Sequence, residues 1–214
     1  MLLAEAFVLL ALDVDGTLAR GTTNQPAAAV GVTGALVTEL AQGGHLDLGD
    51  GRIRRTGTRP AHRLLGQVLD NLAPHEGKEL KRKLAAVKRS GWKEVVDGMV
   101  VDGLLGREKK LLRPTRHPVL DRGAHAVLLA EVRAAATTER PLDERTATLL
   151  ALAGPCQMLE VVAPDRADRA VARRRIAEAT EQVPAAAAVK YVIAAMQSAA
   201  AIAAVGGATA GGAG

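Results

Sequence analysis

The chain has 214 residues, enough for one domain with a sizeable core. Hydrophobic residues make up 48% of it but aromatic residues only 1%, so Leu, Val, Ile, Met and Ala must fill the core, and this composition favours helices. The net charge of +5 predicts attraction to polyanions, without distinguishing nucleic acid from acidic lipid surfaces. The single cysteine, Cys156, excludes an intramolecular disulfide and a cysteine-rich zinc site.

The N-terminal segment, residues 2–12, is a short apolar run that fits either a helix or a buried strand. Glu5 within the run, and the lack of basic residues before it, argue against a signal peptide. Asp15-Gly16 predicts a turn, and residues 21–25 a loop. No stretch of the sequence reaches the roughly 18 apolar residues of a spanning helix, so any membrane contact is expected to be peripheral.

The next segment predicts a helix followed by a hairpin. Pro26 suits the first turn of a helix, and Gly43-Gly44 would end it. Asp50-Gly51 then predicts a two-residue turn between a strand near Leu46 and a basic second strand. At helical spacing, one face of the helix would be apolar: Val30, Val37, Leu40 and Ala41.

Three apolar stripes at helical spacing follow, at residues 64–72, 80–87 and 92–100. Pro74 ends the first helix and Gly91 separates the other two. Asp102-Gly103 ends the third, and residues 104–113 (LLGREKKLLR) read as two short strands of a hairpin. Basic residues surround the second stripe: Lys78, Lys81, Arg82, Lys83, Lys88 and Arg89.

The remainder of the chain predicts four more helical segments. Leu128 and Val132 mark one helix, Asp143 caps a second, Asp165 caps a charged third, and Pro184 opens the last. Residues 206–214 are Gly/Ala-rich and are expected to be a disordered tail. Residues 1–205 are then expected to form a single domain.

One motif suggests an enzyme. FVLLALDVDGTLA, residues 7–19, looks like the first motif of the haloacid-dehalogenase superfamily, in which Asp13 would be the nucleophile and Asp15 the general acid/base of a phosphohydrolase. The other motifs of that superfamily are not found in the sequence. The alternative interpretation is that Asp13, Asp15 and Gly16 form a turn after the first helix.

A second alternative is a DNA-binding protein. The predicted helix at 92–102, followed by the hairpin 104–113, looks somewhat like a winged helix, and basic residues cluster nearby. Glu94, Asp97 and Asp102 on that helix would repel DNA phosphates, so no nucleic acid is expected as a partner. The scattered histidines lack metal-ligand spacing, so neither a metal nor any other cofactor is expected. His117 is expected to form a structural hydrogen bond.

Five segments in register resemble the Golgi phosphoprotein 3 family. The order and spacing match along nearly all of residues 1–205. The segments are MLLAEAFVLLAL (residues 1–12), GALVTELAQGGHLDL (34–48), VVDGLLGREKKLLRPTRHP (100–118), LDERTATLLALA (142–153), and the charged helix around RRRIAEA with the Ala-rich final helix.

This resemblance implies a mainly α fold: a single helical domain with amphipathic helices around a helical core and one or two short β-hairpins. It also implies a protein that is not an enzyme and that binds phosphatidylinositol 4-phosphate at a basic pocket. The hairpin 104–113 would contribute to self-association through four leucines: Leu104, Leu105, Leu111 and Leu112.

The pocket pattern of the eukaryotic members is only partly present. It has Trp at position 24 and Arg at positions 33, 89 and 92, where this chain has Asn24, Thr33, Arg89 and Trp92. A guanidinium grips phosphate with a planar fork that Thr and Trp lack. The residues expected to bind the lipid headgroup are Lys88, Arg89, Trp92 and Lys93.

The resulting functional prediction is a peripheral membrane protein that binds anionic phospholipid headgroups, with phosphatidylinositol 4-phosphate as the ligand that the family implies. The composition, rich in Ala, Gly and Arg, is typical of bacterial proteins, and a bacterium has no Golgi. We therefore expect the protein in the cytoplasm, on the inner face of the membrane.

Overall fold

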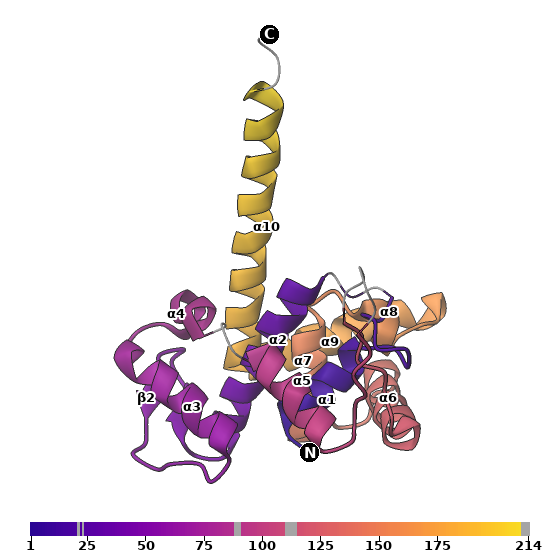
Figure 1. Cartoon of the computed structure of the whole chain (residues 1–214), viewed down its shortest axis with the longest axis horizontal. Helices are drawn as coiled ribbons and strands as arrows, with labels where there is room; N and C mark the ends of the chain where they lie inside the picture. Colours follow the sequence, from indigo (N-terminus) through magenta and orange to yellow (C-terminus); the bar gives the residue numbers. More distant parts are fainter. Residues whose placement is uncertain (21, 23, 88–90, 110–114, 211–214) are drawn as a thin grey trace.

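The computed structural model describes residues 1–20, 22, 24–87, 91–109 and 115–210, and the fold is mainly α-helical, as the sequence predicts (Figure 1). Two 3-10 turns, Ala73–His75 and Arg166–Asp168, and the antiparallel strands β1 (Leu46–Asp47) and β2 (Arg54–Arg55) accompany the helices. The α-helices are α1 (Leu3–Ala11), α2 (Gln25–Gln42), α3 (Arg63–Leu72), α4 (Leu80–Val87), α5 (Gly91–Val101), α6 (Arg122–Thr137), α7 (Glu144–Ala153), α8 (Leu159–Val162), α9 (Arg169–Gln182) and α10 (Pro184–Ala210).

The N-terminal run, residues 2–12, forms the central helix α1. Every residue of α1 except Glu5 is buried, and Phe7 is fully so. A helix that is apolar on all sides needs neighbours on all sides, and α1 packs against α2, α5, α6 and α7. The choice between helix and buried strand, which the pattern left open, is therefore settled as a helix.

Helix α2 crosses the core and has small residues where other segments approach. The Asn24 side chain accepts a hydrogen bond from the Ala27 amide at 2.8 Å, and Pro26 lies in the first turn, as expected. A Cβ at Gly31 would overlap the Phe7 ring and the sulfur of Cys156. Burial raises the pKa of the Cys156 thiol to about 12, so this cysteine is an inert part of the core.

The first hairpin forms, but the predicted two-residue turn is wrong. Leu46 pairs with Arg55 and Asp47 with Arg54, which leaves residues 48–53 as a longer connection. The reason is Ile53: it is fully buried, its amide donates to the Lys78 carbonyl at 3.0 Å, and its carbonyl accepts from the Gly77 amide at 2.8 Å. Because Ile53 is buried against the segment before α4, residues 48–53 do not join the pairing between β1 and β2.

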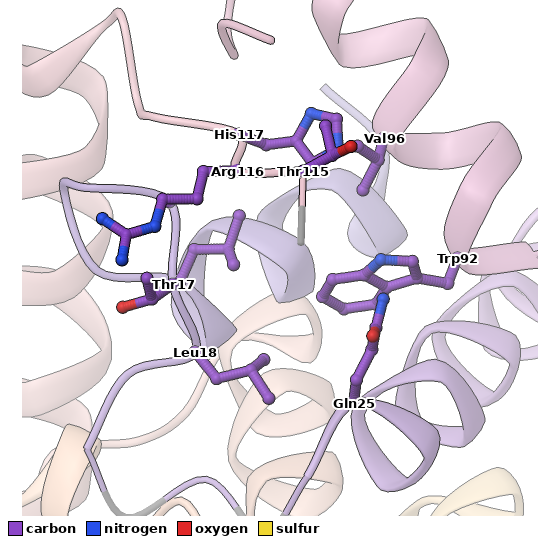
Figure 2. Close-up of a pocket in the computed structure, with 10 residues that line it drawn as sticks. Thr17, Leu18, Gln25, Trp92, Val96, Thr115, Arg116 and His117 are labelled. Carbon is purple, nitrogen blue, oxygen red and sulfur yellow. The ribbon is translucent and has the colours of Figure 1, made fainter. Parts of the chain in front are cut away.

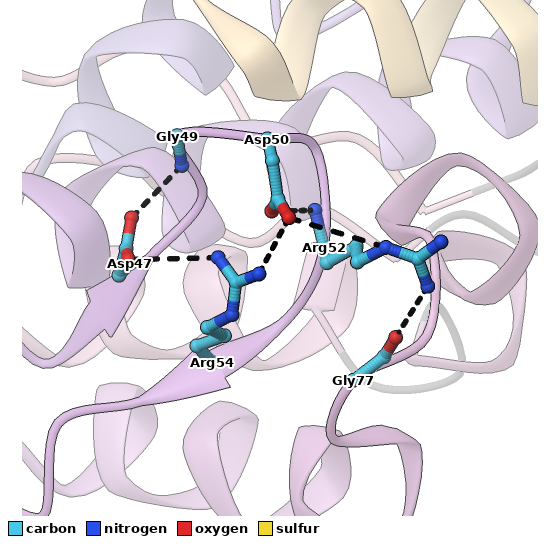
Figure 3. Close-up of polar contacts among 6 residues, drawn as sticks. All are labelled: Asp47, Gly49, Asp50, Arg52, Arg54 and Gly77. Carbon is cyan, nitrogen blue, oxygen red and sulfur yellow. Dashed lines mark hydrogen bonds and ion pairs between the residues drawn. The ribbon is translucent and has the colours of Figure 1, made fainter.

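Polar contacts hold this longer connection (Figure 3). The Asp50 carboxylate accepts from the Arg52 amide at 3.1 Å and pairs with the Arg54 guanidinium. The Arg52 guanidinium donates to the Gly77 carbonyl at 2.8 Å. The connection is therefore fastened to the segment before α4 rather than closed as a tight turn.

The second predicted hairpin, residues 104–113, has different pairing partners. Leu105 bridges Val119 and Glu108 bridges Arg116, both antiparallel, so residues 105–108 pair with 116–119. This register buries both Leu105 and Val119 in the core, which explains why it wins over a pairing within 104–113. Residues 110–114, including Leu111 and Leu112, lie outside the described residues.

The capping predictions for the C-terminal helices have opposite outcomes. Asp143 caps α7, and its carboxylate accepts from the Thr146 amide at 2.9 Å. The prediction that Asp165 caps the charged helix is wrong, because a 3-10 turn intervenes and the Asp165 side chain makes no capping hydrogen bond. That turn is fixed by Arg169, whose guanidinium donates to the carbonyls of Ala163 and Pro164.

The last helix, α10, begins at Pro184 as predicted and extends well away from the other helices in Figure 1. Its first turns pack on α2, α4, α7 and α9, with Val189, Val192 and Ile193 buried. It continues to Ala210, and the alanines before that residue favour continuation of the helix. The single domain over residues 1–205 and the disordered tail at 206–214 stay predictions. None of the helices in the described part of the chain combines the length and hydropathy needed to cross a membrane.

Candidate functional site

Two adjoining cavities lie where the turn after α1, the start of α2, the first turns of α5 and the 116–119 strand meet. The inner cavity has a volume of ≈ 340 Å³ and the outer one ≈ 600 Å³. We call them the inner lobe and the outer lobe of one cleft, because the same five residues line both: Gln25, Trp92, Val96, Thr115 and His117. The inner lobe is completed by Leu12, Gly16, Thr17, Leu18 and Arg116, and the outer lobe by Lys93, Asp97, Arg107 and Lys109.

The inner lobe is bounded by the turn at residues 12–18. One Asp13 oxygen accepts from the amides of Asp15 and Thr17, and the other accepts from the Thr17 hydroxyl at 2.7 Å. Leu12 and Leu18 then pair as an antiparallel bridge, which brings Leu18 beside the end of α1. These contacts make the turn a fixed wall of the lobe.

Gly16 sets how closely this turn approaches the opposite strand. Its φ is +73°, and a Cβ here would overlap the backbone of His117 and Pro118. His117 itself forms the expected structural hydrogen bond, from ring Nδ1 to the Gly106 carbonyl at 3.2 Å. The turn after α1 and the strand 116–119 are therefore packed backbone to backbone.

The geometry of this turn does not favour the phosphohydrolase interpretation. Asp13 follows a helix rather than the strand that the haloacid-dehalogenase motif requires, and both its oxygens are engaged within the turn. Asp15 is exposed. Across the described ranges, no group of three or more His, Cys, Asp or Glu side chains is placed to hold a metal ion.

Trp92 forms the boundary between the two lobes. Its ring extends from the first turn of α5 into the cleft, with the Gln25 side chain directed toward it (Figure 2). The ring is partly buried and packs against the core, while Val95 and Val96 on the same helix are buried. Gly91 permits this position, since its backbone approaches Thr33 on α2 so closely that a Cβ would lie 3.3 Å from the hydroxyl.

The outer lobe is basic. Lys93, Arg107 and Lys109 line it together with the carboxylate of Asp97, so these side chains give the lobe a net formal charge of +2 with His117 neutral. Asp97 accepts from the Lys93 ammonium at 2.6 Å and from the Arg107 guanidinium. The hydrogen bond from Lys93, followed by the charges of Lys93 and Arg107, holds the pKa of Asp97 below its usual range.

Two helices begin at the cleft. Gln25 is the first residue of α2, and Trp92 and Lys93 lie in the first turn of α5. At α2, Asn24 already accepts from the Ala27 amide and Pro26 has no amide hydrogen, so these two positions offer no donor to an anion. The side-chain cations Lys93, Arg107 and Lys109 make the outer lobe suited to a phosphate or carboxylate group.

The structure brings only some of the predicted headgroup residues together. Trp92 and Lys93 both line the cleft, whereas Lys88 and Arg89 lie outside the described residues. At the other positions of the family pattern, Asn24 caps α2, and Thr33 is buried with its hydroxyl donating to the Ala29 carbonyl.

Several cleft residues were missed at the level of sequence. Arg107 and Lys109 belong to the segment assigned to self-association, Gln25 was expected in a loop, and His117 was expected to have only a structural role. The sequence signal was the basic run REKK beside the helix that carries Trp92.

The leucines assigned to self-association are in different environments. Leu104 is partly buried, and Leu105 is buried in the core. Because Leu105 faces inward within this chain, Leu104 is the more accessible of these two leucines. Self-association through this segment stays a prediction.

The helical fold, with its basic cleft at the ends of two helices, defines a class of mainly α proteins with an anion-suited surface site. The chain belongs to the Golgi phosphoprotein 3 (GPP34) family, whose sequence model matches residues 3–196. The same family was inferred from the five segments in register, and the match spans nearly all of the chain. A search of curated proteins returned no match.

Proposed function

We propose that this chain is a peripheral membrane protein that binds anionic phospholipid headgroups in the outer lobe, and that it acts by binding rather than by catalysis. The observation that carries the proposal is the convergence of Lys93, Arg107 and Lys109 on one cavity. Membership of the Golgi phosphoprotein 3 family supports it. The cytoplasmic leaflet, which is rich in anionic lipids, is the surface that fits this charge.

The charge of the lobe sets the strength and selectivity of this binding. Each Lys or Arg near an anionic membrane contributes about 1 kcal/mol, and salt screens the interaction. The eukaryotic pattern has guanidiniums at positions 33 and 92, where this chain has Thr33 and Trp92. We therefore propose selection of anionic headgroups as a class, with less preference for phosphatidylinositol 4-phosphate than the complete pattern would give.

Vesicle flotation at about 0.15 M salt tests this proposal, because screening is then realistic. The vesicles would be neutral, generically anionic, or anionic with phosphatidylinositol 4-phosphate. We expect flotation with both anionic types and none with the neutral one. The outer-lobe variant Lys93→Gln/Arg107→Gln/Lys109→Gln should lose it.

A matched control removes three exposed cations that line neither lobe: Arg166, Arg173 and Lys190. Its net charge equals that of the outer-lobe variant, so it separates a specific site from general attraction to the membrane. Equal flotation of the outer-lobe variant and the wild type would refute the assignment. Equal loss in both variants would show adsorption without a site.

The DNA-binding alternative is less well supported by the same region. Helix α5 packs against α1 and α2 with Val95, Val96 and Met99 buried, so much of its surface is unavailable to a DNA groove. Its polar side carries Glu94 and Asp97 among the cations. These carboxylates would face DNA phosphates, which disfavours that use of the helix.

A further inference from the structure

We infer that the cleft binds a single-chain anionic amphiphile, with its charged group in the outer lobe and its hydrocarbon chain in the inner lobe. This inference rests on the proposed function and deepens it, because it names the part of the ligand that headgroup binding alone leaves out. The observation behind it is that Leu12 and Leu18 line the inner lobe, that Lys93, Arg107 and Lys109 line the outer lobe, and that Trp92 lines both.

Apolar side chains form one side of the inner lobe. Leu12, Leu18 and Val96 line it with the Trp92 ring (Figure 2). An apolar chain placed against these side chains would gain by leaving water.

Two of the polar side chains that border the inner lobe are already hydrogen-bonded within the protein. The Thr17 hydroxyl donates to Asp13 at 2.7 Å, and His117 Nδ1 is hydrogen-bonded to the Gly106 carbonyl. The Arg116 guanidinium points away from the Trp92 ring in Figure 2. An apolar chain can therefore lie against the Leu18, Val96 and Trp92 side of the lobe without displacing these hydrogen bonds.

The size of the inner lobe limits the chain that it accepts. Its volume of ≈ 340 Å³ is at the small end of ligand pockets, which span roughly 300–1,000 Å³. That space suits one chain segment rather than the paired tails of a bilayer phospholipid. An anionic lipid with one chain is the chemistry that fits both lobes.

The first test measures the affinity of the wild-type protein for ethyl, butyl, hexyl and octyl phosphate, below the concentrations at which they form micelles. Each methylene that enters the inner lobe should strengthen binding by about threefold to fourfold, until the lobe is full. Equal affinity for all four compounds, or no binding of any of them, would overturn the inference.

Trp92 reports directly on the lobe, because it is the one tryptophan of the chain and its ring lines both cavities. Entry of a chain should move its fluorescence emission to shorter wavelength, and octyl phosphate should have a larger effect than ethyl phosphate. An unchanged emission at saturation with octyl phosphate would contradict entry of the chain.

Two variants separate the roles of the lobes. Leu18→Gln makes the inner lobe more polar and should flatten the dependence on chain length, with octyl phosphate losing the most affinity and ethyl phosphate the least. Lys109→Gln removes one charge from the outer lobe and should weaken all four compounds by about fivefold, leaving the chain-length dependence unchanged. Thermal unfolding of both variants checks that they fold, and the wild-type series stands whether or not they do.

Vesicle flotation, measured in parallel, distinguishes the failure of this inference from the failure of the proposed function. Flotation with anionic vesicles but no chain-length dependence would keep the headgroup site and overturn the amphiphile site. Chain-length dependence without flotation would support the amphiphile site for soluble ligands and refute the membrane role. Failure of both measurements would overturn both.

Discussion

The two walls of the cleft are held in opposite ways. The turn after α1 is fixed by hydrogen bonds to Asp13 and by the close backbone contact at Gly16. The α5 wall carries Lys93 and Asp97, which pair at the surface, and the Lys93 side chain is 84% exposed. The turn after α1 therefore contributes to stability, whereas the α5 wall leaves its charges available to a ligand.

This difference separates stability from binding within one site. Exposed ion pairs contribute only about 0–1 kcal/mol to folding, because water and salt screen them. Buried packing and fixed backbone geometry contribute several times more per residue. Substitutions in the turn should therefore be detected in unfolding experiments, and substitutions on the α5 wall in binding experiments.

Gly16→Ala should have the largest effect on stability. The alanine would hold an unfavourable positive φ and its methyl group would overlap the backbone of His117, so we expect a loss of about 2–4 kcal/mol in the free energy of unfolding. Denaturant titration measures it. Gly103→Ala serves as a control, because its φ is also positive but a Cβ there meets no other atom within 4 Å. Equal losses in the two variants would contradict the role of the close contact.

Asp97→Asn should change binding more than stability. The substitution removes the carboxylate that pairs with Lys93 and Arg107 and raises the formal charge of the outer lobe. We expect affinity for alkyl phosphates to increase by about fivefold, with less than about 1 kcal/mol change in unfolding free energy. Weaker binding in this variant would show that Asp97 positions the cations rather than competing with the ligand.

The helical parts of the fold could be predicted because their signals are local. The apolar stripe of α3 and the cap at Asp143 depend on residues within a few positions of one another. Asp165 has the same residue type and also precedes a charged helix, yet contacts of Arg169 with Ala163 and Pro164 determine a different start. A capping residue therefore predicts a helix start only where no contact from outside its own turn determines that start.

The cleft could be predicted only in part because its residues come from separate segments. Trp92 and Lys93 were found through the family pattern and the basic cluster, whereas Gln25 and His117 join them only in the folded chain. Likewise, the pairing of Leu105 with Val119 is decided by burial of both side chains, which the sequence of residues 104–113 does not contain. Long-range packing supplied the part of the site that local patterns could not.

The smallest expected effect is a pH dependence of the α5 wall. Its cations hold the pKa of Asp97 below the usual range, so this carboxylate stabilises the fold above the ordinary Asp pKa of about 3.9 and loses that contribution as pH falls through the lowered value. The substitution Lys93→Gln removes the ammonium group that is the main cause of the lowered Asp97 pKa. We expect the variant to lose less stability than the wild type over that acid range, by under about 1 kcal/mol after screening.

The pKa of Glu39 is shifted in the opposite direction to that of Asp97, so its effect on stability has the opposite pH dependence. Burial raises its pKa, so its contribution is complete below the ordinary Glu pKa of about 4.3 and is lost as pH rises through the raised value. Unfolding titrations of wild type, Lys93→Gln and Glu39→Gln across this range should therefore show two differences of opposite slope. If Lys93→Gln follows the wild type throughout, the ion pair with Asp97 does not persist in solution, and Lys93 is free to bind a ligand without displacing it.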